Sequence, residues 1–238
     1  MGPALQDDDM NRRVQENWWM MAALLATSVG CQSMSWPAVW PFPERQRTTY
    51  RGPAMRIDAI EQFATQSTGV DSPEQREIAD QLARQIQVEP DPLVRAAVIR
   101  TIAEFRAPIS QQVLEAGLAD EDAAVRIACC RALGRRAEAT AVGHLAQSLR
   151  NDKDQDVRLA AAEALGLIKS PESMQALVVA LNDRDPAMQY VGVQSMKSVT
   201  GKDYGGDVQA WRQLAAGETP PPPKAPSLAE RVRSVSPF

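Results

Sequence analysis

Four stretches of the chain repeat one order of hydrophobic and polar positions. They start at Asp91, Asp122, Asp154 and Asp185, which lie 31, 32 and 31 residues apart. After each aspartate come an apolar residue, an arginine or glutamine, a small or apolar residue and a large apolar residue. These positions hold Val94, Val125, Val157 and Met188; Arg95, Arg126, Arg158 and Gln189; Ala97, Ala128, Ala160 and Val191; and Ile102, Leu133, Leu165 and Met196. A fixed period of this length is typical of a solenoid of stacked repeats.

Each repeat contains two amphipathic helices. In the first copy, the apolar residues between Val94 and Phe105 follow the spacing of one helical face. Asp91 stands just before them, where an N-cap side chain accepts hydrogen bonds from free backbone N–H groups. An earlier amphipathic stretch precedes each later start, with apolar positions at Val113, Leu114 and Leu118; Val142, Leu145 and Leu149; and Met174, Leu177 and Leu181. The sequence therefore predicts units made of a first helix, an acidic turn and a second helix.

The motif resembles a known repeat family. The Asp-x-x-[Val/Met]-[Arg/Gln] start and the Ala-Leu-Gly finish are similar to HEAT repeats, especially the short class that also occurs in phycobilisome lyases. The resemblance covers about residues 88–200. It implies an all-α fold, a right-handed α-solenoid of HEAT-like helical repeats. Because repeat arrays host many functions, it says little about activity.

Weaker patterns on both sides of the repeats predict capping helices. Residues 54–87 contain degenerate helical stretches that would form the first cap. At the other end, Asp207 has the place of an N-cap, and Val208, Trp211 and Leu214 fall on one helical face. We therefore expect a repeat domain over residues 54–216.

The N-terminal region has the pattern of an export signal. Residues Trp18–Gly30 form an uncharged run of 13 residues, which is shorter than the roughly 20 residues of a membrane span but fits a signal-peptide hydrophobic region. Arg12 and Arg13 supply the basic start that such signals have. Asp7–Asp9 do not fit this pattern, so we expect translation to begin at Met10.

The apolar run ends in a motif that resembles a bacterial lipobox. Gly30 precedes Cys31, and in lipoproteins such a cysteine receives a diacylglycerol group and becomes the mature N-terminus. Ser28 departs from the motif, which usually has an apolar residue there. The resemblance implies a signal peptide over residues 1–31 and a lipid anchor on Cys31. The alternatives are an ordinary cleaved signal and an uncleaved apolar helix.

Proline-rich segments flank the repeat domain. Residues 32–53 hold four prolines, and this density favours an extended tether between the membrane and the domain. Trp36, Trp40 and Phe42 would rest either at the lipid surface or against the domain. Residues 217–238 are also rich in proline and poor in apolar side chains, which predicts a disordered tail.

The amino-acid composition of the chain argues against several classes of function. The chain has 238 residues and a net charge of -4, without the basic excess that nucleic-acid binders show. Its one histidine, His144, and three cysteines offer few ligands for zinc. Cys129 and Cys130 align with small core positions, and His144 lies on a helix flank. We predict no cofactor, no metal site, no small-molecule substrate and no enzymatic activity.

The charges of the repeat motif point to a structural role. Three aspartate–arginine pairs are four residues apart: Asp91 and Arg95, Asp122 and Arg126, and Asp154 and Arg158. The HEAT resemblance implies that the matching residues form a hydrogen-bonded ladder between neighbouring repeats. The alternative is an arginine track that binds a ligand. Asp152, Asp154 and Asp156 match part of a calcium loop, but the position that needs glycine is Val157.

One aligned position of the second helices falls away from the apolar stripe, and it holds Arg100, Arg131, Glu163 and Gln194. In a HEAT-like stack these side chains would project side by side along the inner surface. Arg100 and Arg131, with Arg135, would then form a patch for an acidic segment of a protein partner. The alternative is that all four are ordinary solvated positions.

Together these patterns predict a non-catalytic scaffold or adaptor. We expect an exported protein that is lipid-anchored to the bacterial membrane on its periplasmic side and binds an unidentified protein. Two other functions remain open: an enzyme-associated module of the phycobilisome-lyase type, and a purely structural repeat protein of the envelope.

Overall fold

The computed structural model describes residues 52–221, and this part of the chain is entirely helical. It has ten α-helices, no strand and two short 3-10 helices at Gly117–Ala119 and Ala139–Ala141. The α-helices are α3 Pro53–Ala64, α4 Pro73–Val88, α5 Pro92–Ile102, α6 Pro108–Ala116, α7 Ala123–Arg136, α8 Val142–Asn151, α9 Gln155–Leu167, α10 Pro171–Leu181, α11 Pro186–Thr200 and α12 Val208–Ala215. None of them combines the length and apolar character that crossing a bilayer requires.

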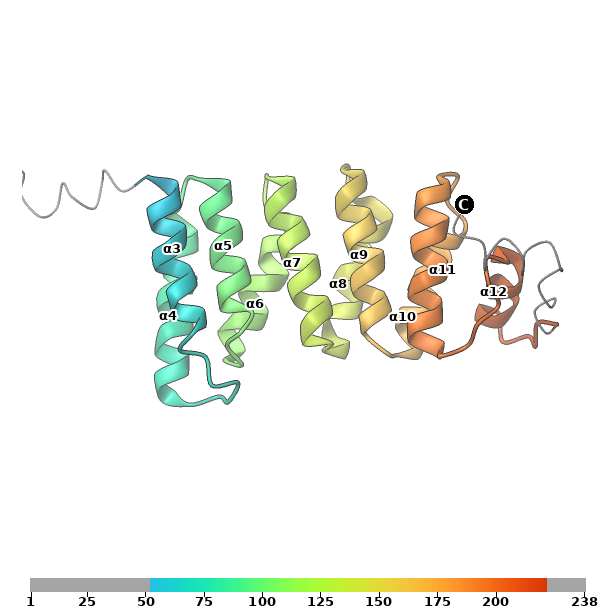
Figure 1. Ribbon diagram of the computed structural model, residues 1–238, viewed down its shortest axis with the longest axis horizontal. Coiled ribbons are helices and arrows are strands. Elements are labelled where there is room, and N and C mark those ends of the chain that lie inside the picture. Colours follow the sequence, from blue (N-terminus) through green and yellow to red (C-terminus); the bar gives the residue numbers. More distant parts are fainter. Residues whose placement is uncertain (1–51, 222–238) are drawn as a thin grey trace, which may run out of the picture. The chain divides into compact units, whose positions relative to one another are not determined.

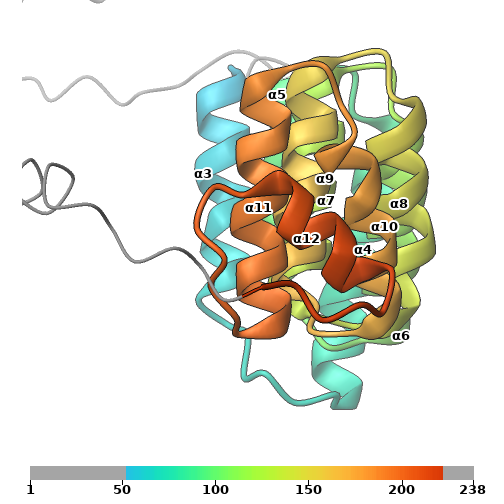
Figure 2. The same cartoon turned by 90° about the vertical axis from the view of Figure 1, so that its right-hand side faces the viewer.

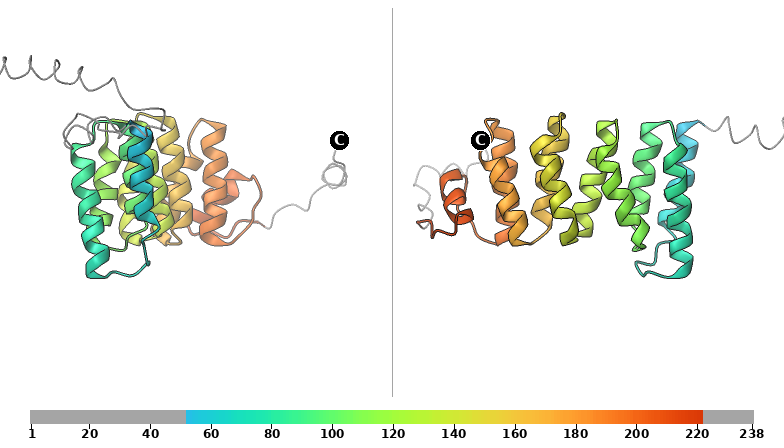
Figure 3. Two further views of the ribbon diagram at one scale, coloured as in Figure 1. Left: turned by 60° about the vertical axis from the view of Figure 1, so that its left-hand side comes forward. Right: turned by 180° about the vertical axis from the view of Figure 1, so that it is seen from behind.

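The helices stack in two layers. Helices α3, α5, α7, α9 and α11 stand side by side in one layer, and α4, α6, α8 and α10 form the other (Figure 1). The repeat units are α4–α5, α6–α7, α8–α9 and α10–α11, so each second helix of a unit lies in the α3 layer. Figure 3 shows the same stack from two further sides. The domain is thus an α-solenoid of helical repeats, as the sequence predicted.

Aspartates begin the second helices. The carboxylate of Asp91 accepts a hydrogen bond from the N–H of Leu93 at 2.9 Å, and that of Asp122 accepts one from Ala124 at 2.8 Å. Asp154 and Asp185 cap α9 and α11 in the same way. The expected N-caps are confirmed, and because they repeat at a fixed period, every second helix starts at an equivalent level of its layer.

Small residues let the second helices pack closely. A Cβ atom added to Gly134 of α7 would lie 2.7 Å from the Cα of Ala164 in α9. At Gly166 of α9 it would lie 2.7 Å from the Cβ of Ser195 in α11. These contacts leave no space for a larger side chain, which explains why alanine and glycine replace bulky residues along this layer.

The C-terminal helix α12 covers the last repeat. It packs on α10 and α11 and lies across the end of the two layers (Figure 2). Trp211 is fully buried, its ring meets that of Tyr204 edge-on at 5.2 Å, and its indole N–H donates to the carbonyl of Gly205. The predicted capping helix is confirmed. Beyond the expected boundary at residue 216, Pro220 is buried and the N–H of Glu218 donates to the carbonyl of Gln213.

Candidate functional site

The side of the second helices that faces away from the first-helix layer, called here the second-helix face, contains a shallow hollow. Helices α5, α7 and α9 line it, and its volume is about 490 Å³. Arg100, Arg131 and Glu163 line this hollow together with Arg135. Three of the four aligned polar residues therefore lie together, as expected. The fourth, Gln194, lies on α11 beside a neighbouring hollow.

The three arginines of the predicted patch differ in their partners. Arg100 is half exposed and forms an ion pair with Glu61 of α3 at 3.3 Å. Arg131 and Arg135 are exposed, and within residues 52–221 neither side chain takes part in a hydrogen bond or ion pair. The positive charge that remains uncompensated is therefore centred on α7. The sequence missed this difference because Glu61 lies outside the repeats and has no counterpart in the alignment.

Apolar side chains accompany these charges. Ile127 of α7 and Leu159 of α9 are half-buried in the hollow, and Leu93 of α5 is 60% exposed at its edge. Ala128 and Ala160 lie between the larger side chains. An apolar floor beside exposed charges is similar in composition to the apolar centre and polar rim of protein interfaces.

A second hollow of about 500 Å³ lies on α11 and the loop that leads to α12. Tyr190, which is 65% exposed, lines it together with Gln194 and Lys197. Lys197 forms an ion pair with Asp203 at 2.5 Å. Because Tyr190 aligns with Ile127 and Leu159, this hollow continues the second-helix face toward the C-terminal end of the array.

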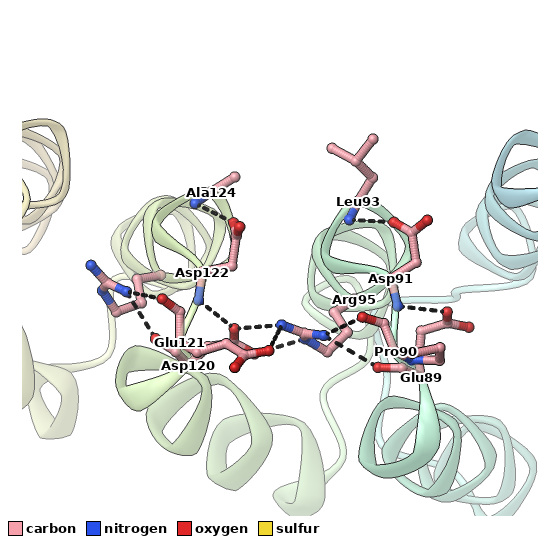
Figure 4. A network of polar contacts seen from close by, with 10 residues as sticks. Glu89, Pro90, Asp91, Leu93, Arg95, Asp120, Glu121, Asp122 and Ala124 are labelled. Atoms are coloured by element: carbon pink, nitrogen blue, oxygen red, sulfur yellow. Dashed lines mark hydrogen bonds and ion pairs between the residues drawn. The ribbon is translucent and has the colours of Figure 1, made fainter.

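Arginines join the repeats on the turns at one end of the helices (Figure 4). Arg95 donates from Nε and Nη2 to both carboxylate oxygens of Asp120, each at 2.9 Å, and from Nη1 to the carbonyl of Pro90. Arg126 repeats this arrangement with Asp152, at 2.8 and 3.0 Å, and with the carbonyl of Asp120 at 2.8 Å. Each arginine therefore ties the turn before its own helix to the turn of the next unit.

The carboxylates of this ladder are not the expected ones. Asp91, Asp122 and Asp154 are N-caps, so the assignment of these three aspartates to the ladder is wrong. The acceptors are Asp120 and Asp152, which come two residues before a capping aspartate. The repeated acidic residue of each turn, as in Asp-Glu-Asp at 120–122, was the sequence signal for them. The carboxylate of an N-cap faces the first N–H groups of its own helix. The aspartate two residues earlier is therefore the one that accepts from the arginine.

Burial and the arginine contacts shift the pKa of the acceptor carboxylates in opposite directions. Burial of Asp152 disfavours its charged form, but the hydrogen bonds from Arg126, the backbone N–H of Asp154 and the charge of Arg126 together outweigh this effect and hold the pKa below the ordinary value of 3.8. Asp120 shows the same balance with Arg95, and its pKa is also lowered. Both ladder pairs are therefore ionised at neutral pH, with side chains that are at most 15% exposed.

The third arginine of the ladder, Arg158, has no carboxylate partner among residues 52–221. Its side chain donates to the carbonyl of Asp152 at 2.9 Å. Asp183 holds the equivalent place in the next turn and accepts from the N–H of Asp185, the backbone bond that Asp120 and Asp152 also accept in their turns. The last unit carries Gln189 at the arginine position, and its side chain donates to the carbonyl of Asp183 at 2.7 Å. The side-chain ladder therefore ends before the last repeat.

One buried arginine was not anticipated. Arg136 at the end of α7 donates to the carbonyl of Phe105 at 2.7 Å and pairs with Glu138 at 2.8 Å. It closes the end of the preceding unit, so its role is structural. It occurs in one repeat only, which is why the repeat alignment gave no signal for it.

The remaining candidate residues take structural positions. Cys129 and Cys130 are fully buried, as predicted, and burial raises the pKa of the Cys130 thiol to about 12. His144 is half exposed on α8, with Nδ1 at 3.9 Å from Glu115. The carboxylate of Asp152 accepts from Arg126, and that of Asp154 caps α9. The spacing that resembles a calcium loop therefore follows from the repeat motif.

Two predicted segments lie outside the described residues. The signal peptide with Cys31 and most of the tether, with its aromatic residues, belong to residues 1–51, whereas the last predicted tether residue, Pro53, begins α3. Most of the proline-rich tail belongs to residues 222–238. The lipid anchor on Cys31 stays a prediction.

Comparison with known proteins identifies the repeats. The family of HEAT repeats matches residues 79–166 and 142–204. A comparison with curated proteins finds no match. The family match covers the two-layer stack of α5 to α11 and the arginine ladder within it. Because these matches take in more than half of its length, the chain belongs to the family of HEAT-repeat proteins.

Proposed function

We propose that the protein is a non-catalytic scaffold that binds an acidic segment of a protein partner on its second-helix face. HEAT repeats are typical of scaffolds and protein-interaction modules, and this chain has such repeats at residues 79–204. The observation that carries the proposal is the pair Arg131 and Arg135, which are exposed, uncompensated within residues 52–221 and adjacent to a hollow with an apolar floor.

The chemistry of the hollow supports a protein rather than a small molecule. The hollow is open to solvent and mixes alanine, isoleucine and leucine with charges of both signs. Small-molecule sites are usually deep and enclose most of the ligand, which this surface does not. Charged groups around an apolar centre steer a partner of opposite charge and suppress other partners.

The proposal includes attachment to a membrane through Cys31. The apolar run that ends at Gly30–Cys31 supports it, and several acyl chains on one cysteine would hold the protein firmly, at about 0.8 kcal/mol for each buried methylene. The test replaces Cys31 by serine in the native host. We expect wild type to take up labelled fatty acid and to remain with the membrane fraction, and the variant to do neither. Equal membrane retention, without label in wild type, would overturn the anchor.

Charge reversal tests the binding face. Arg131→Glu with Arg135→Glu changes the uncompensated charges and leaves the Arg100–Glu61 pair in place. The control, Arg150→Glu with Arg184→Glu, changes the net charge equally at exposed positions away from the hollow. Affinity purification from envelope extracts is followed by mass spectrometry, and circular dichroism shows that each variant is folded.

We expect the wild type and the control to retain the same partner, and the reversal at α7 to lose it by about tenfold or more. Retention in wild type should also weaken as salt is raised. A partner that all three proteins retain equally, at low and high salt, would place the binding surface elsewhere.

A further inference from the structure

Three successive second helices, α7, α9 and α11, each present one large apolar side chain at the same aligned position. These residues are Ile127 of α7, Leu159 of α9 and Tyr190 of α11, called here the apolar row. The first two are half-buried in the hollow, and Tyr190 is 65% exposed beside the next hollow. The row therefore runs across the helices, and each of its members is open enough to receive a contact.

Charges change sign along the row. Arg131 and Arg135 belong to the helix of Ile127, whereas Asp156 and Glu163 belong to the helix of Leu159. All four are exposed, and none of them forms a side-chain hydrogen bond or ion pair in the part of the chain that the structure describes. A ligand that crosses these helices thus meets a basic environment at α7 and an acidic one at α9.

We infer that the second-helix face binds an extended, polyproline II-like segment of the partner, with one apolar residue placed on each helix of the row. This inference rests on the proposed function and specifies its binding mode. The segment carries an acidic residue next to the apolar residue over α7 and a basic residue next to the one over α9. Charge complementarity fixes that order.

The spacing of helices selects this conformation. Packed helices lie about 8–10 Å apart. A polyproline II segment rises about 3.1 Å per residue with three residues per turn, so every third side chain points the same way at about 9.3 Å. A β-strand places side chains of one face about 6.6 Å apart, which is too short for neighbouring helices. Polyproline II is therefore the extended conformation that fits one anchor per helix.

Small residues leave room for the backbone of such a segment. Ala128 and Ala160 stand one position after Ile127 and Leu159 and line the same hollow. Ala128 is half-buried and Ala160 is buried, so neither side chain obstructs the hollow beside the apolar row. An extended segment is narrower than a helix, which is about 10–12 Å across with its side chains, and so needs less width above these residues.

The test pans a displayed library of random peptides, each about 12 residues long and thus able to span the three helices, against the full chain in detergent. Arg131→Glu with Arg135→Glu is panned in parallel, and Arg150→Glu with Arg184→Glu is the matched control. Enriched peptides are sequenced, and their affinities for all three proteins are measured by fluorescence anisotropy.

We expect enriched peptides to have apolar residues at every third position, with an acidic residue near one and a basic residue near the next. Their affinity should fall about tenfold for the reversal at α7 and stay unchanged for the control. Enrichment of helical or alternating spacing, or of no peptide, would overturn the extended mode. If the peptides failed in this way but binding of the native partner still required Arg131 and Arg135, the proposed function would stand without the extended mode. If neither the peptides nor the native partner required these arginines, both proposals would be overturned. Displacement of the peptides by a synthetic copy of residues 32–53 would make the chain itself the occupant and overturn the choice of a partner.

Discussion

Arg126 and Asp152 form a two-pronged ion pair between neighbouring repeats, with N–O distances of 2.8 and 3.0 Å and side chains only 6% and 8% exposed. The third guanidinium nitrogen donates to the carbonyl of Asp120. The side chain of Arg126 thus connects the turn before α7 with the turn before α9, in the middle of the array.

Removal of this arginine should destabilise the domain. Arg126→Ala leaves the carboxylate of Asp152 buried without its partner, and the loss of one member of a buried pair typically costs about 3–5 kcal/mol. Chemical unfolding followed by circular dichroism measures the change. Arg158→Ala is the matched control, because Arg158 has no acidic partner in residues 52–221 and should cost clearly less. Equal losses for both variants would contradict the ladder as the source of stability.

Acid should weaken the same joint. The pKa of Asp152 is lowered in the folded protein, so the unfolded chain binds its proton at higher pH than the folded chain does. The stabilisation from Asp152 is therefore complete above the unfolded-state pKa of about 3.9 and is lost as the pH falls through the folded pKa. The stability gap between wild type and Asp152→Asn should be largest at neutral pH and should close in acid. A gap that stays constant across the titration would show that the charge of Asp152 does not matter.

The close approach of α7 and α9 gives a steric prediction. Gly134→Ala places a methyl group 2.7 Å from the Cα of Ala164, and the helices must separate to accept it. We expect a loss of about 1–3 kcal/mol, as for other overpacked cores. Gly143→Ala in α8 is the control, since nothing lies within 4 Å of the added atom. That variant should be neutral or more stable by up to about 1 kcal/mol.

The C-terminal boundary of the domain can be located by truncation. A chain that stops after Pro221 keeps the buried Pro220 and the hydrogen bond from the N–H of Glu218 to the carbonyl of Gln213. It should melt like the full chain. A chain that stops after Ala216 loses both and should melt several degrees lower, because about 1 kcal/mol corresponds to roughly 2–4 °C in a domain of this size. Identical melting of both truncations would move the boundary back to residue 216.

Periodicity accounts for what the sequence predicted well. The second helices, their aspartate caps and the shared direction of Arg100, Arg131 and Glu163 all follow from positions that recur in every unit. The errors concern residues whose partners break the period. Glu61 neutralises Arg100 from a helix outside the repeats, and Arg136 occurs once.

The choice between neighbouring aspartates was a different problem. Asp120 and Asp122 are two positions apart in one acidic turn, and composition does not tell a cap from an ion-pair acceptor. The direction of the backbone decides it, because the carboxylate of Asp122 faces the N–H of Ala124 and that of Asp120 faces the preceding unit. An alignment of the repeats shows which residues recur, but it does not show where their side chains point.

Asp120 serves two units at once, since its carboxylate accepts from Arg95 of one unit and its carbonyl accepts from Arg126 of the next. The Arg95–Asp120 and Arg126–Asp152 joints are therefore built from the same donor on one side and the same acceptor on the other. Duplication or in-frame loss of one central unit would leave matching ends to meet. The length of the binding surface could then change in evolution by whole units, without redesign of the contacts that hold the array together.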